Sequence, residues 1–533
     1  MANLLEEASI LLTPTAYNNG SMLAVKPENG DGDFTFSRNS AATRVNAEGL
    51  VENVQILSSN LVVNGDFAND SVWAKDANWS IANGKATSTG VGRMYQSIPF
   101  LETNVGSTVV VSFDIVDYTS GSTIIQCYGG VQGVFTGVGT HTFTTVTTNT
   151  LNFYINNSGQ GNMVGSIDNV SVKVITHDTN LPRINYEDGC GSWLLEPQST
   201  NSIPNSEDFG VSDWIKSRSL VSSNVVTSPS GIVDADKFIG SSVSGDKKIS
   251  DSISVVSGNK YTFSVFAKKA EFDGLALRLN TAAFPSGYVL FNLDNGVGTA
   301  IGIVDDFLSE DYGNGWWRLS ATSTADTTLN CALELLLANS GAITNVGNDV
   351  DGVYIWGAQA EQQSFATSYI PTQGAAATRL KDVANSSGNA SLINSEEGVL
   401  YAETKAFVHN GNITLSDGSN SNNLLIGFNL NSGRIDCNMK VGGAYQFIFN
   451  YTTDMSINNK IAVRYKANDF ALFVNGIKVL TDTSGITPAA NTFDRLNFSS
   501  ANTVANYFYG ENKALAVYKT ILTDEQLTSL TTV

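Results

Sequence analysis

The sequence predicts an all-β protein made of tandem antiparallel β-sandwiches. Short runs of alternating apolar and polar residues recur along the 533 residues, separated by Gly, Asn, Asp and Ser. Few segments show the sustained apolar period that an amphipathic helix needs. Hydrophobic residues make up 42% of the chain and charged residues only 15%, so ordinary cores can form and charge-driven disorder is not expected. A chain of this length should hold several domains.

Charge and cysteine content exclude several classes of partner and site. The net charge is −20, from 50 acidic and 30 basic residues without a Lys/Arg cluster, so we expect no nucleic-acid partner. The four cysteines show no CxxC spacing, which predicts neither a disulfide framework nor a zinc site. No stretch approaches about 20 apolar residues, so we expect no membrane insertion. The opening run, MANLLEEASILL, lacks the basic start of a signal peptide.

Residues 1–55 are expected to form a β segment that is incomplete by itself. They contain two strand-like pieces around a turn at 46–49, and residues 180–201 have the same extended character around a turn at 187–189. The two regions resemble a module of tailed-bacteriophage structural proteins, in which an "R-x-S-x-A-T" strand leads to "PR-x-x-Y" and then "LLLEPQ-x-TN". The resemblance implies a virion-docking segment, completed by residues 177–200, with a domain inserted between two strands that pair in space. The alternative is that each region is a plain linker.

Residues 56–176 form the expected insert. They open with NLVVNGDF, followed by two tryptophans, and close with IDNVSV. Both motifs resemble those of galactose-binding-like jelly rolls in carbohydrate-binding modules, a fold whose first and last strands lie side by side. The resemblance implies that Asp66 lies near Asp168 and that the pair holds a structural calcium ion, since carboxylates with carbonyl oxygens suit a hard cation. The alternative is that Asp66 caps a turn and Asp168 lies at a strand edge.

Residues 201–373 repeat this plan. NSEDF and Trp214 parallel the earlier opening, and the closing strand carries W-G-A-Q-x-E. Two equivalent openings, about 140 residues apart, indicate a duplication and hence a second jelly roll of the same family. Trp316 and Trp317 are adjacent, so one of them faces outward if their segment is a strand.

The C-terminal part is expected to comprise a linker, residues 374–394, and a last sandwich, residues 395–533. The linker is small and polar, and its ATRLKDVA resembles the connector that precedes C-terminal sandwiches in phage proteins. In the last domain, alternating strands flank an Asn475-Gly476 hairpin turn, and Thr523 is placed to cap a short closing helix. These features resemble the concanavalin-like (laminin G-like) sandwich that ends many phage fibre proteins.

The sequence shows no catalytic constellation. The three histidines, His141, His177 and His409, fall in different expected segments, and no nucleophile-elbow, H-E-x-x-H, P-loop or Rossmann fingerprint is present. We therefore expect neither enzymatic activity nor a required cofactor. Glycosidic cleavage needs only two neighbouring carboxylates, and the 50 acidic residues leave that alternative open.

Sugar binding on a β-sandwich depends on exposed aromatic faces that stack on pyranose C–H groups. The candidates in this chain are Tyr95, Tyr128, Trp316 and Trp79. Each has the alternative of burial in a core, which is the commoner fate of aromatic residues. Trp73 and Trp214 follow the two domain openings at a matched offset, so we expect them to pack inside the sandwiches. The polar loop 410–423 is a further candidate for glycan or calcium binding.

The expected function is that of a bacteriophage virion structural protein, a fibre or tail-associated subunit that displays β-sandwiches for binding host-surface glycans. The resemblance implies docking to other virion proteins and a homotrimer, although no heptad repeat predicts a coiled coil. It also implies synthesis in the host cytoplasm and a location in the virion. One alternative is a capsid decoration or head-fibre protein that binds other virion proteins. A second is a polysaccharide depolymerase or its binding module.

Overall fold

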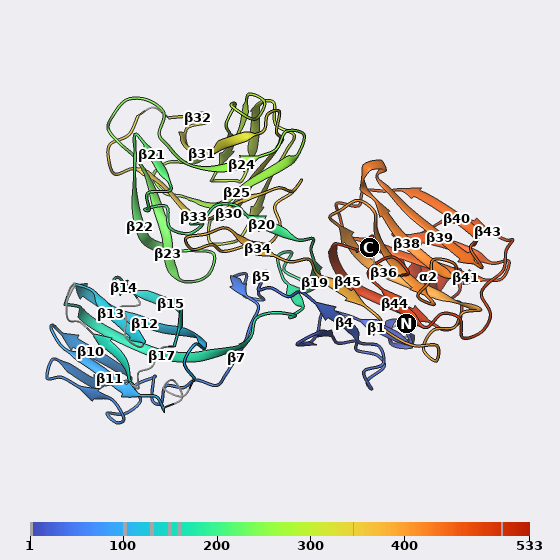
Figure 1. Cartoon of the computed structure of the whole chain (residues 1–533), viewed down its shortest axis with the longest axis horizontal. Helices are drawn as coiled ribbons and strands as arrows, with labels where there is room; N and C mark the ends of the chain where they lie inside the picture. The colour runs from blue at the N-terminus through green and yellow to red at the C-terminus, as the bar shows by residue number, and fades with distance from the viewer. Residues whose placement is uncertain are drawn as a thin grey trace.

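The computed structural model describes residues 4–99, 104–127, 133–147, 152–156, 162–344, 346–502 and 505–533. It is an all-β molecule of three sandwiches, with a group of short strands between them (Figure 1). The all-β fold predicted from the alternating runs is confirmed. No helix in the part of the chain so described has the length and apolar character needed to cross a bilayer.

The first sandwich follows the N-terminal strands. Its larger sheet has the order β15 (Gly139–Val146), β12 (Thr108–Ser120), β17 (Val164–His177), β10 (Lys85–Thr89) and β9 (Trp79–Ala82). Its smaller sheet has the order β14 (Val134–Phe135), β13 (Thr123–Cys127), β16 (Asn152–Asn156), β11 (Arg93–Ser97) and β8 (Ala74–Lys75). The short strand β7 (Ile56–Leu57) pairs with the end of β17, so the segments that lead into and out of this sandwich lie side by side.

The second sandwich also consists of two antiparallel sheets. One sheet has the order β21 (Ile215–Ser217), β24 (Lys248–Val255), β31 (Leu329–Asn339), β26 (Gly274–Leu279), β27 (Gly287–Asn292) and β28 (Gly298–Gly302), with β32 (Ala342–Ile343) on β31. The other has the order β22 (Ser219–Thr227), β23 (Val233–Gly240), β33 (Gly352–Glu361), β25 (Lys260–Lys269), β30 (Trp316–Thr324) and β29 (Asp306–Asp311). Alternate residues of these strands face inward and form its core.

The C-terminal sandwich recruits strands from distant parts of the chain. Its larger sheet has the order β18 (Arg183–Asn185), β19 (Ser192–Leu195), β45 (Gly510–Tyr518), β36 (Glu397–Ala406), β41 (Asn459–Lys466), β42 (Phe470–Val474) and β43 (Ile477–Asp482), with β1 (Ile10–Leu12) on β45. Its smaller sheet has the order β40 (Ala444–Thr452), β39 (Arg434–Val441), β38 (Asn423–Asn429), β37 (Gly411–Ser416) and β44 (Arg495–Asn497). A short 3-10 turn, η2 (Leu430–Ser432), joins β38 to β39, and another, η1 (Leu4–Glu7), precedes β1.

Two local predictions for this sandwich are confirmed. Asn475 and Gly476 both have positive φ and connect β42 to β43, as a two-residue hairpin turn requires. Thr523 caps helix α2 (Asp524–Thr531) through a capping box: its hydroxyl accepts from the Gln526 amide, and the Gln526 side chain accepts from the Thr523 amide.

Short strands connect the three sandwiches. A four-stranded sheet has the order β2 (Tyr17–Asn18), β3 (Ser21–Met22), β4 (Phe34–Ser37) and β35 (Val383–Asn385). Two pairs complete the set: β5 (Thr43–Val45) with β6 (Val51–Asn53), and β20 (Ser199–Asn201) with β34 (Ala377–Arg379). We call the C-terminal sandwich, together with residues 8–55, 181–201 and 374–394, the base. One continuous core runs through it, because Ile10, Phe36, Trp193 and Ala384 pack with Leu400 and the other inward residues of the C-terminal sandwich.

Residues 374–394 do not form the expected linker. They contain β34 and β35. Arg379, the last residue of β34, and Asp382, between the two strands, are buried. The segment runs through the base as short strands and turns and bonds to distant parts of it: the Ser387 hydroxyl, for example, donates to the Gly32 carbonyl at 2.7 Å.

The two regions that flank the insert meet in space. The amide of Tyr186 donates to the Val45 carbonyl at 3.0 Å, and the amide of Val45 donates to the Asn185 side chain at 2.9 Å. The contact joins residues about 140 apart in sequence, so the first sandwich is inserted between two segments of the base.

Candidate functional site

The tryptophan candidates for glycan binding are wrong. Trp79 is 3% exposed and Trp316 is 2% exposed, so neither can offer a ring face to a sugar. Trp79 lies in the core of the first sandwich, and Trp316 packs in a second cluster near Trp356. Of the adjacent pair, Trp317 is the less buried, but its indole donates to the Leu293 carbonyl at 3.1 Å.

The matched tryptophans pack inside the two sandwiches, as predicted. The Trp73 indole donates to the Asn64 carbonyl at 3.0 Å, and its ring lies 5.5 Å from that of Phe67. In the second sandwich, the Trp214 indole donates to the Asn205 carbonyl at 2.8 Å, next to the ring of Phe209. Each indole therefore closes the opening loop of its own sandwich in the same way.

Of the tyrosine candidates, Tyr128 lies outside the described residues. Tyr95 is half-buried on β11 and pairs across the sheet with Tyr154, whose ring lies 5.3 Å away. Met94 and Phe153, on the alternate positions, lie in the core, so the two tyrosines occupy the outer face of the smaller sheet. This pair stays a candidate platform for a sugar.

Asp66 lies on a polar hollow where the opening segment runs along β17. The amide of Val170 donates to the Gly65 carbonyl at 2.9 Å, and a Cβ on Gly65 would lie 2.0 Å from the Val170 carbonyl oxygen, so only glycine fits there. The hollow has a volume of about 340 Å³. Its polar lining comes from Asn60, Asn64, Asp66, Asn169 and Ser171.

The structure places the two aspartates of the calcium prediction in separate local contacts. The Asp66 carboxylate accepts from the Ala68 amide at 3.4 Å, and that of Asp168 accepts from the Asn169 amide at 2.7 Å. Within the described ranges, no three His, Cys, Asp or Glu side chains are grouped to hold a metal ion. Calcium binding at Asp66 and Asp168 therefore stays a prediction without a built coordination sphere.

A second polar site, not expected from the sequence, lies on the outer face of the second sandwich. On β31, Leu333 and Leu335 point into the core, so the intervening Glu334 points outward. Its side chain is nevertheless only 2% exposed, because neighbouring strands supply polar side chains that cover it. In the sequence, this site is marked by a single acidic residue within the apolar run of β31.

Glu334 holds three donors in fixed positions. Lys248 Nζ lies 2.6 Å from Oε1, Asn280 Nδ2 donates to the same oxygen at 3.2 Å, and Arg278 Nε donates to Oε2 at 2.5 Å. Burial alone would raise the pKa of Glu334, but the hydrogen bond from Lys248 and the charge of Arg278 hold it below the ordinary value. The carboxylate is therefore ionised at neutral pH and fixes two cations that remain partly exposed.

Other side chains extend this face. The strand register places Ser250 on β24 directly across from Glu334, on the side opposite Arg278. The next row of the same face is apolar, with Leu336 and Leu290 covered in part by Tyr288. The arrangement offers two cations, an amide, a hydroxyl and an aromatic ring on one sheet face.

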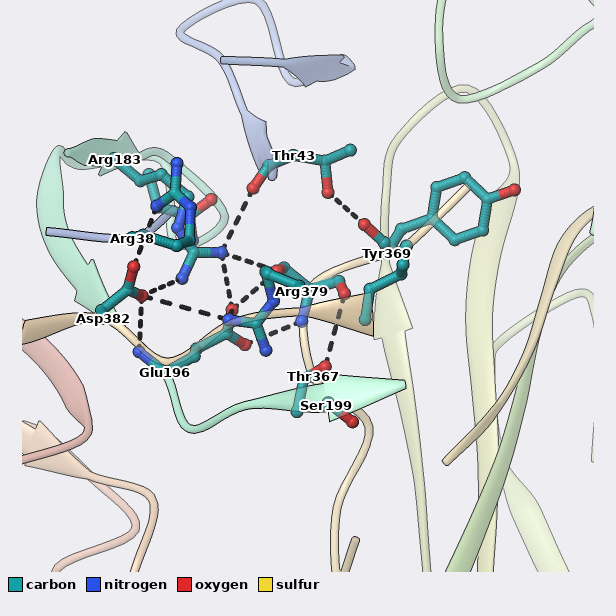
Figure 2. Close-up of polar contacts among 12 residues, drawn as sticks. Arg38, Thr43, Arg183, Glu196, Ser199, Thr367, Tyr369, Arg379 and Asp382 are labelled. Carbon is teal, nitrogen blue, oxygen red and sulfur yellow. Dashed lines mark hydrogen bonds and ion pairs between the residues drawn. The ribbon is translucent and has the colours of Figure 1, made fainter. Parts of the chain in front are cut away.

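A buried polar cluster lies in the base, where three arginines meet two carboxylates (Figure 2). Asp382 accepts from Arg38 Nη1 at 2.9 Å and from Arg183 Nη2. Glu196 accepts from Arg183 Nη1 at 2.6 Å and lies 3.0 Å from Arg379 Nη1. The five residues come from the N-terminal segment, the β18–β20 region and the β34–β35 region, so the cluster joins these three segments of the base.

The charges of the cluster stabilise one another. Burial acts to raise the pKa of Glu196, but Arg379 and Arg183, with hydrogen bonds from Ser368, lower it to about 2. Burial acts on Asp382 in the same direction, and Arg183 and Arg38 again outweigh it, so its pKa lies below the ordinary value. Both carboxylates are therefore ionised at neutral pH. The sequence analysis identified the motifs that contain these residues, but it did not predict that their side chains form a buried ion cluster.

No family model matches the chain, and a search of curated proteins finds no match. Among solved structures, the chain is similar to the Ruminococcus gnavus IT-sialidase CBM40 bound to α2,3-sialyllactose, with 17% identity over 28% of this chain and 93% of that one and a TM-score of 0.24. It is also similar to domains LG4-5 of the mouse laminin α1 chain, with 11% identity over 61% of this chain and 89% of that one and a TM-score of 0.18. A third is Bacteroides ovatus xyloglucan PUL GH43B, with 11% identity, coverages of 84% and 99% and a TM-score of 0.19. Similarities at this level assign no ligand to this chain.

Proposed function

We propose that this chain is a bacteriophage virion structural protein that displays β-sandwiches for binding host-surface glycans, without catalysing a reaction. The observation that carries the binding role is the Glu334 face of the second sandwich. There a buried carboxylate holds Lys248, Arg278 and Asn280 in place, while both cations stay partly exposed.

Such a face suits a sugar for two reasons. Glycan hydroxyls are recognised by fixed donors and acceptors, and the bonds to Glu334 restrict the Arg278 and Lys248 side chains before a ligand arrives. The half-buried ring of Tyr288 lies on β27, next to the strand that carries Arg278, where an apolar sugar face can contact it. Because two cations face one carboxylate, we propose that the face favours glycans that carry a carboxylate of their own.

The virion role rests on the sequence resemblance of residues 1–55, 177–200 and 395–533 to phage modules. The base would dock on other virion proteins, and the first two sandwiches would project from it. Assembly as a homotrimer would multiply a weak affinity per site through avidity. Mass spectrometry of purified phage particles tests this part: we expect the chain among the structural proteins, and its absence would contradict the virion role.

A glycan array probed with the labelled full chain tests the binding role. We expect binding to host-surface glycans with a carboxylate, and a loss of about tenfold or more in affinity for Arg278→Ala, because a hydrogen bond to a charged group contributes roughly 1.5–3 kcal/mol. Lys269→Ala is the matched control, since Lys269 pairs with Asp294 on the surface of the same sandwich. A wild-type chain that binds no host glycan, or an Arg278→Ala variant that binds as well as wild type, would overturn the proposal.

A further inference from the structure

The smaller sheet of the C-terminal sandwich ends in an edge strand that lacks the usual protection. Among the strands that the structure describes, β40 pairs only with β39. It is 9 residues long, and the stretch 441–453 around it contains no charged residue and no proline. Edge strands of folded proteins are usually short, or they carry charges or proline that prevent further pairing. A long and neutral edge strand is therefore suited to pair with another strand.

The strand register shows which backbone groups of β40 are free to pair. The amide of Thr453 donates to the carbonyl of Gly433, the residue opposite it, at 3.0 Å. Because the bonds alternate along an antiparallel pair, the amides and carbonyls of Ile448, Asn450 and Thr452 point away from β39. No hydrogen bond between described residues reaches these groups. All three residues are exposed, and Ile448 has an exposed fraction of 57%.

The surroundings of β40 cover only its first half. There Gln446 is the extra residue of a β-bulge, and its Oε1 accepts from the amide of Ile486 in the loop after β43, at 3.0 Å. The neighbouring edge strand of the larger sheet, β43, carries Lys478 and Asp482, which protect it from pairing. Figure 1 shows β40 and β43 at the end of the C-terminal sandwich that faces away from the other two sandwiches. The second half of β40 is therefore open to a partner.

This half of the strand is complementary to itself. When two copies of β40 lie antiparallel with Asn450 opposite Asn450 of the second copy, the outward amides and carbonyls of both strands find partners. The same register places Ile448 opposite Thr452 on the outer face and Phe449 opposite Tyr451 on the inner face. Cross-strand pairs of β-branched or aromatic residues stabilise antiparallel sheets.

Charge favours the same partner. The chain has a net charge of −20, so two copies repel each other wherever their charged surfaces meet. Pairing through β40 brings neutral residues together. On the outer face of the adjacent strand β39, Arg434 and Asp436 pair with each other. Lys440 lies over the ring of Tyr445, 4.5 Å from its centroid, at the other end of β40. A second copy therefore meets no unpaired like charge at this edge.

We propose that β40 is a homotypic interface, at which two copies of the chain pair edge to edge about a twofold axis. The smaller sheets of the two C-terminal sandwiches then form one continuous sheet, with Asn450 at the axis. The contact is made by the base, so it does not depend on glycan binding or on the virion role. If the chain also forms the homotrimer proposed above, each pair of β40 strands joins two trimers.

Analytical ultracentrifugation of the full chain tests the interface. We expect wild type to associate in pairs, and Asn450→Pro to weaken this association by about tenfold or more, because it removes a donor at the axis. An edge strand tolerates proline where the N–H faces solvent, so the bonds to β39 are kept. Ile448→Lys places a charge at the contact and should have the same effect. Val63→Lys is the matched control, since Val63 is 62% exposed in the first sandwich.

Cysteine cross-linking tests the register. The Cα atoms of a hydrogen-bonded antiparallel pair lie about 5.5 Å apart, a separation that a disulfide can span. Asn450→Cys should therefore form a covalent dimer under mild oxidation, in a Cys190→Ser background that removes an exposed thiol. Asn438→Cys, on the same face of β39, is the control. It should not cross-link, because the two copies of this residue would lie about 14 Å apart or more.

Three results would overturn the proposal. One is a wild-type chain that sediments only as a monomer or only as a homotrimer at the highest concentration that stays in solution. Another is an Ile448→Lys variant that is folded by circular dichroism and still pairs as wild type does. The third is an Asn450→Cys variant that cross-links no more than Asn438→Cys. None of these results bears on glycan binding or on the composition of phage particles, so the proposals fail separately.

Discussion

Asp382 illustrates how single buried residues hold the base together. Its carboxylate accepts hydrogen bonds from Arg38, from Arg183 and from the Glu196 amide at 2.8 Å, with 2% of the residue exposed. Asp382→Asn keeps the shape but removes the charge, which leaves Arg38 without its carboxylate partner and Arg183 with Glu196 alone. Breaking a buried pair in this way costs about 3–5 kcal/mol. We therefore expect a loss of that size in the free energy of unfolding, measured by urea denaturation followed by fluorescence.

A surface pair is the control for this residue-scale prediction. Asp294 pairs with Lys269, but both side chains are largely exposed, and Asp294→Asn should leave the unfolding curve almost unchanged. If Asp382→Asn were as stable as wild type, the buried ion cluster would not be what joins the segments of the base.

At the scale of elements, strand β1 completes the C-terminal sheet. Ile10 and Leu12 face the core and are fully buried, and they lie opposite Val517 and Leu515 of β45. We expect Leu12→Ala to destabilise the C-terminal sandwich by about 2–5 kcal/mol, because it removes buried methyl groups and leaves a cavity. Thermal unfolding monitored by near-ultraviolet circular dichroism measures the effect. Val63→Ala is the control, since Val63 is 62% exposed in the first sandwich.

A Leu12→Ala variant that unfolds with the wild-type midpoint would contradict the pairing of β1 with β45. We expect Val63→Ala to unfold with the wild-type midpoint. That result would show that the loss of stability in Leu12→Ala comes from its burial in β1.

The elements also show what the sequence could and could not predict. Local signals sufficed for the Asn475-Gly476 turn and the Thr523 cap, because their chemistry is contained within a few residues. The packing of Trp73 and Trp214 followed from their matched offsets. The pairing of β1 with β45 joins the two ends of the chain, and nothing in a three-residue apolar run identifies so distant a partner.

The candidate sites were less predictable than the elements. Trp79 and Trp316 were chosen because aromatic residues bind sugars, but the larger free-energy gain from burying an indole placed them in cores. Glu334 was missed because its position between inward leucines becomes informative only when the neighbouring strands supply Lys248 and Arg278. Site residues that come from several strands depend on register, which sequence patterns specify poorly.

In the whole molecule, dispersed segments form a single base on which two sandwiches are mounted. Display of the Glu334 face depends on it. The shared core and the ion cluster predict that residues from the beginning, the middle and the end of the chain unfold together.

Native-state hydrogen–deuterium exchange of the full chain tests this claim most directly. We predict that the amides of β1, β19 and β45 exchange with one common opening free energy, and that Asp382→Asn lowers all three by the same amount. The account would be contradicted if the amides of β19 exchanged at the rate of an unprotected loop while those of β45 stayed protected.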